Sequence, residues 1–188
     1  RFQTLSTVRG VRQIVGRAPG EDAQTGTNEL AQSDAFLEGL KAVGERGLTF
    51  DLQLIPELMP AIAEVLQQVP QTRVALCHAG SPHDRSPEGL REYAQALRSL
   101  SQLPQVYCKL SGLGMFDHNW SAQSIRPIVD ICLDQFGAER CMFGSNFPVD
   151  KLYSSYEKLV QSYFRIVPDG MQRSVFADTG RAFYRLVE

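Results

Sequence analysis

Hydrophobic positions along the chain follow two different periods. Short apolar runs rich in β-branched residues predict strands at residues 7–15, 48–54, 73–80, 105–113 and 140–146. Longer segments, with apolar positions at helical spacing, predict helices at residues 28–46, 56–69, 86–100, 124–136, 154–166 and 169–186. Strands that alternate with helices are typical of parallel βα units, so we expect an α/β fold with these strands as neighbours in one parallel sheet.

The chain contains no Gly/Ser-rich linker and no low-complexity segment that would mark a domain boundary. We therefore interpret residues 1–188 as a single domain. The polar stretch at 16–30 predicts a loop that follows the first strand, on the side of the sheet where active-site loops of βα folds lie.

Composition and charge argue against nucleic acid and membrane as binding partners. A formal net charge of −2 gives no basic footprint for nucleic acid. No apolar run approaches the ~20 residues of a membrane helix, and the first residues lack the apolar segment of a signal peptide. Four cysteines lie in apolar segments without CxxC spacing, which predicts free, buried thiols and a cytoplasmic protein: Cys77, Cys108, Cys132 and Cys141.

Polar side chains recur where the predicted strands end. Gln53, His78 and Asn146 fall at or near the C-terminal ends of their strands, and Lys109 and Ser111 share one face of the strand at 105–113. Alternation along the strands places His78 on the face of Val74 and Leu76, and we take this face as the inward one. In a parallel barrel the carboxyl ends of the strands converge on one mouth, where catalytic groups lie.

Each of these residues also has an ordinary structural interpretation. A lone histidine after an apolar strand is often a core or loop residue, a lysine can extend to solvent, and an asparagine before Phe-Pro can form a turn. Their joint placement favours function most for His78. His83 and His118 fall in predicted loops and receive no role. The sequence has no HExxH, GxSxG, P-loop or GxGxxG motif.

Six motifs together resemble one family. In chain order they are "VRGVR", "TFDLQL", "ALCHAGSP", "KLSGLGMFDHNW", "RCMFGSNFPVD" and "FADTGRAFYRL". They are similar to the amidohydrolase-related group that contains lactone hydrolases of sugar acids and pyrone dicarboxylates. The resemblance implies a (β/α)8 TIM-barrel fold, of which this chain holds the five C-terminal βα units.

The resemblance also implies roles for individual residues. His78 matches the histidine that ends strand six, a catalytic residue and a ligand of a divalent metal, commonly zinc; some relatives work without a metal. Arg12 matches an arginine that reaches a substrate carboxylate. Gln53, Lys109 and Ser111 are assigned to binding an anionic small-molecule substrate.

Two departures from the family pattern stand out. Asn146 occupies the position of the strand-eight aspartate, and an amide has no titratable oxygen with which to accept a proton from water. As a catalytic-site residue, Asn146 can still hold a water or a substrate oxygen by hydrogen bonds. Either the base is another group, with His78 as the best candidate and Asp150 as a remote substitute, or turnover is weak. Replacing Asn146 with aspartate would supply the missing carboxylate.

The second departure is at the front of the barrel, because the chain has no His-x-His pair and only five predicted strands. We therefore expect an N-terminally incomplete barrel, or a homo-oligomer that covers the open sheet edges. The expected function is hydrolysis of a lactone or related ester, with activity of this chain alone left open. Two alternatives remain: a non-catalytic barrel remnant that binds an anionic ligand or partner, and a decarboxylase of the same superfamily.

Overall fold

The computed structural model describes residues 7–16, 18 and 30–186. Five strands form one parallel sheet in chain order, which confirms the predicted topology. The strands are β1 (Gly10–Ile14), β2 (Thr49–Gln53), β3 (Val74–Leu76), β4 (Val106–Leu110) and β5 (Cys141–Phe143). Strands β3 and β5 are shorter than their apolar runs, because the backbone turns before the predicted ends.

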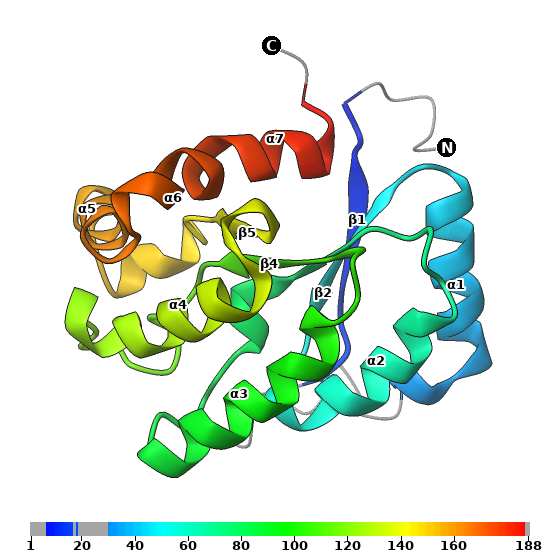
Figure 1. Ribbon diagram of the computed structural model, residues 1–188, viewed down its shortest axis with the longest axis horizontal. Coiled ribbons are helices and arrows are strands. Elements are labelled where there is room, and N and C mark those ends of the chain that lie inside the picture. The colour runs from blue at the N-terminus through cyan, green and yellow to red at the C-terminus, as the bar shows by residue number, and fades with distance from the viewer. Residues whose placement is uncertain (1–6, 17, 19–29, 187–188) are drawn as a thin grey trace.

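Helices follow each strand and complete the α/β pattern (Figure 1). They are α1 (Asp34–Glu45), α2 (Met59–Gln67), α3 (Pro87–Ser101), α4 (Ala122–Phe136), α5 (Tyr156–Ile166), α6 (Asp169–Arg173) and α7 (Thr179–Tyr184). The predicted helix at 169–186 is α6 and α7 joined by a π-helical turn, Ser174–Asp178. Most of the predicted loop at 16–30 lies outside the described residues, as do residues 28 and 29 of the first predicted helix.

Serine side chains start four of these helices. The hydroxyl oxygens of Ser33, Ser86, Ser121 and Ser155 each accept a hydrogen bond from a backbone N–H in the first turn of the helix that follows. This bond satisfies one of the donors that a helix N-terminus leaves free. The first α-helix therefore begins at Asp34, after Ser33, and a short 3₁₀ turn at Leu30–Gln32 precedes it.

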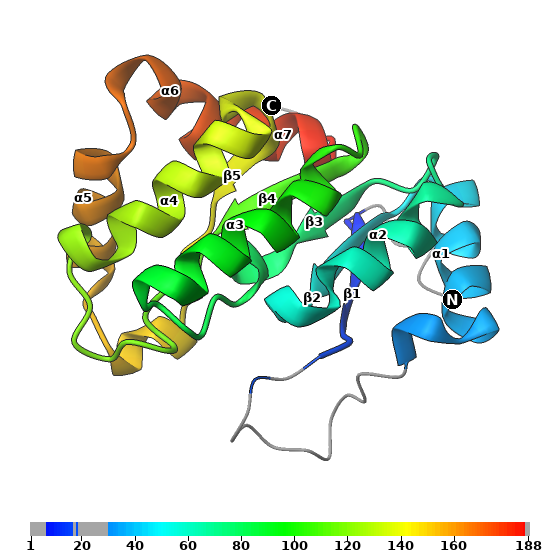
Figure 2. The same ribbon diagram turned by 60° about the horizontal axis from the view of Figure 1, so that its bottom comes forward.

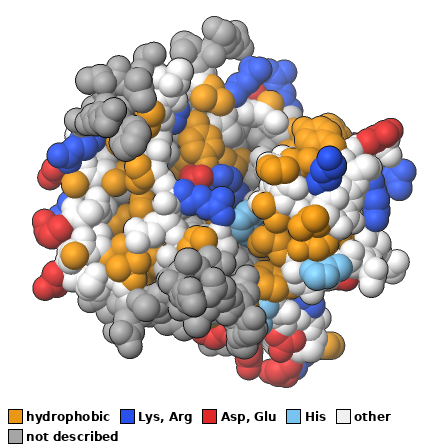
Figure 3. Space-filling view, turned by 180° about the vertical axis from the view of Figure 1, so that it is seen from behind, with side chains coloured by type: hydrophobic (Ala, Val, Ile, Leu, Met, Phe, Trp, Pro, Cys, Tyr) orange, Lys and Arg blue, Asp and Glu red, His pale blue; other side chains and the backbone are white. Residues whose placement is uncertain are grey.

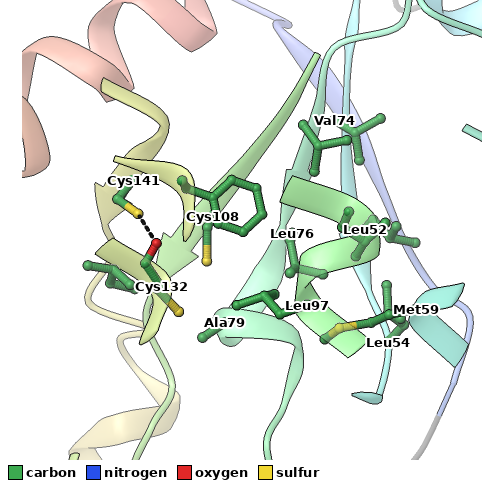
Figure 4. Close-up of a cluster of buried hydrophobic side chains, with 14 of the residues drawn as sticks. Leu52, Leu54, Met59, Val74, Leu76, Ala79, Leu97, Cys108, Cys132 and Cys141 are labelled. Atoms are coloured by element: carbon green, nitrogen blue, oxygen red, sulfur yellow. Dashed lines mark hydrogen bonds between the residues drawn. The ribbon is translucent and has the colours of Figure 1, made fainter. Parts of the chain in front are cut away.

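The main core lies between the sheet and the helices α2, α3 and α4, which cross one face in a row (Figures 1 and 2). Leu52, Val74 and Leu76 of the strands pack with Leu97 of α3 in this layer (Figure 4). All four cysteines are buried and unpaired, which confirms the predicted free thiols. Within the described residues, no helix is long and apolar enough to cross a membrane.

The opposite, inner face of the sheet is less covered. A small cluster of Ala75, Met142 and Phe183 packs there, and Phe183 comes from α7. Basic, acidic and histidine side chains gather at the centre of this face, with hydrophobic side chains around them (Figure 3). The sheet thus has one buried apolar face and one face that carries polar groups.

Candidate active site

His78 reaches the polar groups of the inner face through a left-handed turn. Strand β3 ends at Leu76, and His78, Ala79 and Ser81 then have φ of 54°, 52° and 53°. The prediction that strand alternation places His78 on the face of Val74 and Leu76 is wrong in its reason, because those two side chains pack toward the helices. Consecutive left-handed residues are strained and tend to occur at functional sites.

Hydrogen bonds join residues from four strands around this histidine. Arg12 Nη2 donates to Gln53 Oε1 and lies 3.1 Å from His78 Nε2, and His78 Nδ1 lies 3.0 Å from Ser111 Oγ. A guanidinium is a donor only, so Nε2 accepts and the ring proton is on Nδ1, which donates to Ser111. The structure therefore brings together four of the residues selected from the sequence.

The environment keeps the His78 ring neutral. Burial lowers its pKa to about 4, and the nearby positive charges of Arg12 and Lys109 act in the same direction. The side chain is 5% exposed. At neutral pH the ring is an uncharged imidazole whose one lone pair, on Nε2, faces Arg12.

Gly112 makes room for two polar side chains after β4. Its φ is +61°, and a Cβ at this position would lie 2.5 Å from His78 Nδ1 and 3.1 Å from Asn146 Nδ2. His78 and Asn146 therefore face the same point beside the strand ends. A larger residue would need a strained backbone and would also displace the ring of His78.

Asn146 is hydrogen-bonded to the carboxylate of Asp150, which the sequence suggests only as a remote substitute for the missing base. Its Nδ2 donates to Asp150 Oδ1 at 2.8 Å, and its own φ is 54°. Asp150 is 0% exposed, and its Oδ2 is buried without a direct partner. Burial raises the pKa of Asp150, while the hydrogen bond from Asn146 opposes that rise.

Lys109 belongs to a second cluster on the same face. Its Nζ lies 2.8 Å from Asp51 Oδ2 and 3.1 Å from the hydroxyl of Tyr184, which donates to Asp51 Oδ1 at 2.7 Å. The ammonium group is thus engaged by a carboxylate. Asp51 lies two residues before Gln53 on β2, so strand alternation places the two on one face. Nothing in the pattern around Tyr184 indicates that it reaches β2 from the last helix.

The other two histidines lie apart from His78. His83 pairs with Glu57 at 2.9 Å, and His118 stacks on Tyr153 with ring centroids 4.3 Å apart. In the described part of the chain, no group of three or more His, Cys, Asp or Glu side chains is placed to hold a metal ion. The donor set around His78 does not fit a zinc site, because its nearest neighbours include the cationic group of Arg12.

Relatives in sequence match most of the chain. The profile of the Amidohydrolase family covers residues 6–186. An uncharacterised protein of Sinorhizobium fredii is 35% identical over 182 residues, which make up 95% of this chain and 61% of that protein. L-fucono-1,5-lactonase of Burkholderia multivorans is 33% identical over 135 residues, which are 66% of this chain and 45% of that enzyme.

Solved structures support the same grouping. A zinc-bound amidohydrolase from Burkholderia multivorans superposes with a TM-score of 0.81 at 25% identity, over 95% of this chain and 65% of that one. A putative 2-pyrone-4,6-dicarboxylic acid hydrolase from Pseudomonas putida gives 0.76 at 25% identity, over 96% and 65%. This chain spans less than two thirds of the length of these proteins, which agrees with the expected partial barrel. This chain therefore belongs to the amidohydrolase family.

Proposed function

We propose that the full-length protein is a hydrolase that opens the lactone ring of a small sugar-acid-like or dicarboxylate substrate. The hydrogen-bond network of Arg12, His78 and Ser111 is the main support for this proposal. It brings a cation, a neutral imidazole and a hydroxyl within hydrogen-bonding distance of one another. The names of the relatives point in the same direction: one is an L-fucono-1,5-lactonase and another a putative pyrone dicarboxylate hydrolase.

Arg12 is the substrate-binding group of this proposal. Its side chain is exposed on β1, and its Nη2 atom is shared between Gln53 and His78. The remaining N–H groups of the guanidinium are suited to a carboxylate or a lactone carbonyl. Ser111 supports the far side of the imidazole, so the ring stays in the tautomer that leaves Nε2 unprotonated.

Binding of an anionic group by Arg12 would also prepare the base. When the substrate draws the guanidinium away, Nε2 of His78 loses its hydrogen-bond donor, and one cause of the low pKa is removed. Water then attacks the lactone carbonyl carbon and its proton passes to Nε2. The C–O bond of the lactone ring then breaks, and His78 passes the proton from Nε2 to the leaving alkoxide.

Asn146 and Lys109 have supporting roles in this scheme. The amide oxygen of Asn146 accepts a hydrogen bond from the attacking water but takes no proton. Lys109 contributes positive potential from its pair with Asp51 rather than a direct contact. Zinc is bound in one amidohydrolase relative. Because the described residues do not fit such a site, every step is assigned to side chains of this chain.

The decarboxylase alternative has weaker support. A 2,6-dihydroxybenzoate decarboxylase superposes at 10% identity with a TM-score of 0.56, which reflects the fold alone. Asn146 also counts against it, since a decarboxylase of this superfamily would typically need an aspartate there.

The test uses the full-length protein and a panel of sugar-acid 1,5-lactones together with 2-pyrone-4,6-dicarboxylate. We expect His78→Gln to lower kcat by about 10²- to 10⁴-fold, the usual contribution of a general base. Arg12→Met should mainly raise KM. His83→Gln is the matched control, because His83 pairs with Glu57 away from His78, and it should retain the parent rate. A parent protein that opens no lactone, or a His78→Gln variant at full rate, would refute the proposal.

A further inference from the structure

We propose that Asn146 and Asp150 act as one pair, in which Asp150 carries the acidic group and orients the Asn146 amide so that its oxygen faces the attacking water. This inference rests on the proposed function for its catalytic part. Asp150 is a positioning residue in this pair, because it acts on the attacking water only through Asn146.

The local backbone holds the two residues together. Asp150 lies in the 3₁₀ turn Val149–Leu152, and its backbone N–H donates to the carbonyl of Asn146 at 3.1 Å. The side chains add a second bond, from Asn146 Nδ2 to Asp150 Oδ1 at 2.8 Å. Since the amide NH₂ group is bound by the carboxylate, the orientation of the amide is fixed and its oxygen is left for another donor.

Asp150 is an unfavourable residue for packing alone. Its side chain is fully buried, and Oδ2 has no direct partner. Tyr163 on α5 interacts electrostatically with both Asp150 and Arg85. The Tyr163 hydroxyl and Arg85 Nη1 are also buried without a hydrogen-bond partner. Arg85 Nη1 forms a long ion pair with Asp117 Oδ2 at 3.7 Å, while its Nη2 donates to the carbonyl of Leu113. A buried acid with one unsatisfied oxygen costs stability, which argues for a functional reason to keep it.

The pair also explains why an amide stands at the end of β5. With Asp150 in place, an aspartate at 146 would bring two carboxylates into contact in a partly buried position, where ionisation of both is unfavourable. One residue of the pair must therefore be neutral. Replacing Asn146 alone adds a charge to a place that already holds one, so the informative change exchanges the two residues.

The experiment compares Asp150→Asn, Asn146→Asp and the double exchange in the full-length protein. Thermal unfolding is followed from pH 4 to pH 8, and kinetics are measured on whichever lactone the parent opens. Asn146→Asp should lower Tm at pH 7 by roughly 2–8 °C, because each kcal/mol lost shifts Tm by about 2–4 °C in a domain of 150–250 residues and one or two are lost. The Tm of the double exchange should be higher than the sum of the two single Tm shifts predicts, because the double variant again holds only one carboxylate.

Asp150→Asn separates orientation from stability. Burial of the ionised acid costs most at neutral pH, so this variant should have a higher Tm than the parent at pH 7, and the difference should shrink toward pH 4. Its kcat should nevertheless fall about 10-fold or more, with KM little changed, because the amide is no longer held by a charge. A purely structural Asp150 would give a stable variant at full rate.

Two results would overturn the inference: additive Tm shifts in the double exchange, or parent kcat in Asp150→Asn. If the parent opens no lactone, the proposed function fails on its own, and the unfolding cycle still decides whether Asn146 and Asp150 are coupled. If the parent is active and the cycle is additive, the proposed function stands and the pair does not.

Discussion

At the scale of single residues, Gly112 sets how closely His78 and Asn146 approach. We expect Gly112→Ala to lower the free energy of unfolding by about 2 kcal/mol, since it combines an unfavourable positive φ with overpacking. The added Cβ would lie 2.5 Å from His78 Nδ1, so the ring must move away from Ser111. Urea unfolding measures the loss of stability, and kcat on a lactone measures the displaced ring.

Gly39 provides the matched control for this substitution. It is an exposed glycine within α1, and a Cβ there would meet no atom within 4 Å. Gly39→Ala should therefore stabilise the protein by about 0.5–1 kcal/mol through helix propensity. Equal effects of the two substitutions would show that contact with His78 is not the cause of the loss at Gly112.

The low pKa of His78 predicts an acid-sensitive fold. The ring is neutral in the folded state down to about pH 4. The unfolded chain takes up its proton near pH 6.5. Between these values the unfolded state binds more protons, so stability falls as pH decreases, by about 3 kcal/mol in total. Unfolding free energies measured from pH 8 to pH 4 should show this slope.

His78→Gln should remove most of that slope, because glutamine does not titrate. His118→Gln is the control, since His118 is exposed and lies against Tyr153. A slope that persists in His78→Gln and disappears in His118→Gln would contradict the assignment of the neutral ring to His78.

At the scale of elements, Tyr184 ties the last helix to the second strand. Its hydroxyl donates to Asp51 and accepts from Lys109, so α7 is held against the inner face of the sheet by a partly buried polar cluster. Tyr184→Phe should destabilise the protein by about 1–2 kcal/mol, because both partners lose a hydrogen bond in a partly buried place. Tyr156→Phe, at an exposed position of α5, should change stability little. Similar losses for both, measured by urea unfolding, would show that the cluster contributes nothing.

The elements were predictable where local chemistry decides them. Apolar runs predicted the five strands, and their alternation with helical segments predicted the parallel order β1 to β5. The left-handed turn at His78 could not be predicted, because Ala79 continues it and alanine rarely adopts positive φ. Contacts between distant elements, such as Tyr184 with Asp51, leave no periodic signal either.

At the scale of the whole molecule, the described sheet ends in β1 and β5. Beside β1, an apolar groove is lined by Val11, Phe36, Leu40 and Phe50, and Val11 is 41% exposed. The relatives are longer than this chain, which covers 61% of one and 65% of another. A closed barrel pairs both edge strands with further strands, and of these two edges the apolar groove lies beside β1.

The 188 residues expressed alone should consequently self-associate through β1. We expect the apparent mass in light scattering to rise with protein concentration, because an edge strand that exposes Val11 beside an apolar groove can pair with a second copy. Val11→Lys should shift the chain toward monomer, since a charge on an edge strand opposes such pairing. Leu152→Lys is the matched control: Leu152 is 78% exposed but lies far along the chain from β1, and its replacement should leave the mass unchanged. A chain that stays monomeric at every concentration, or that responds equally to both lysines, would show that β1 is not the associating edge.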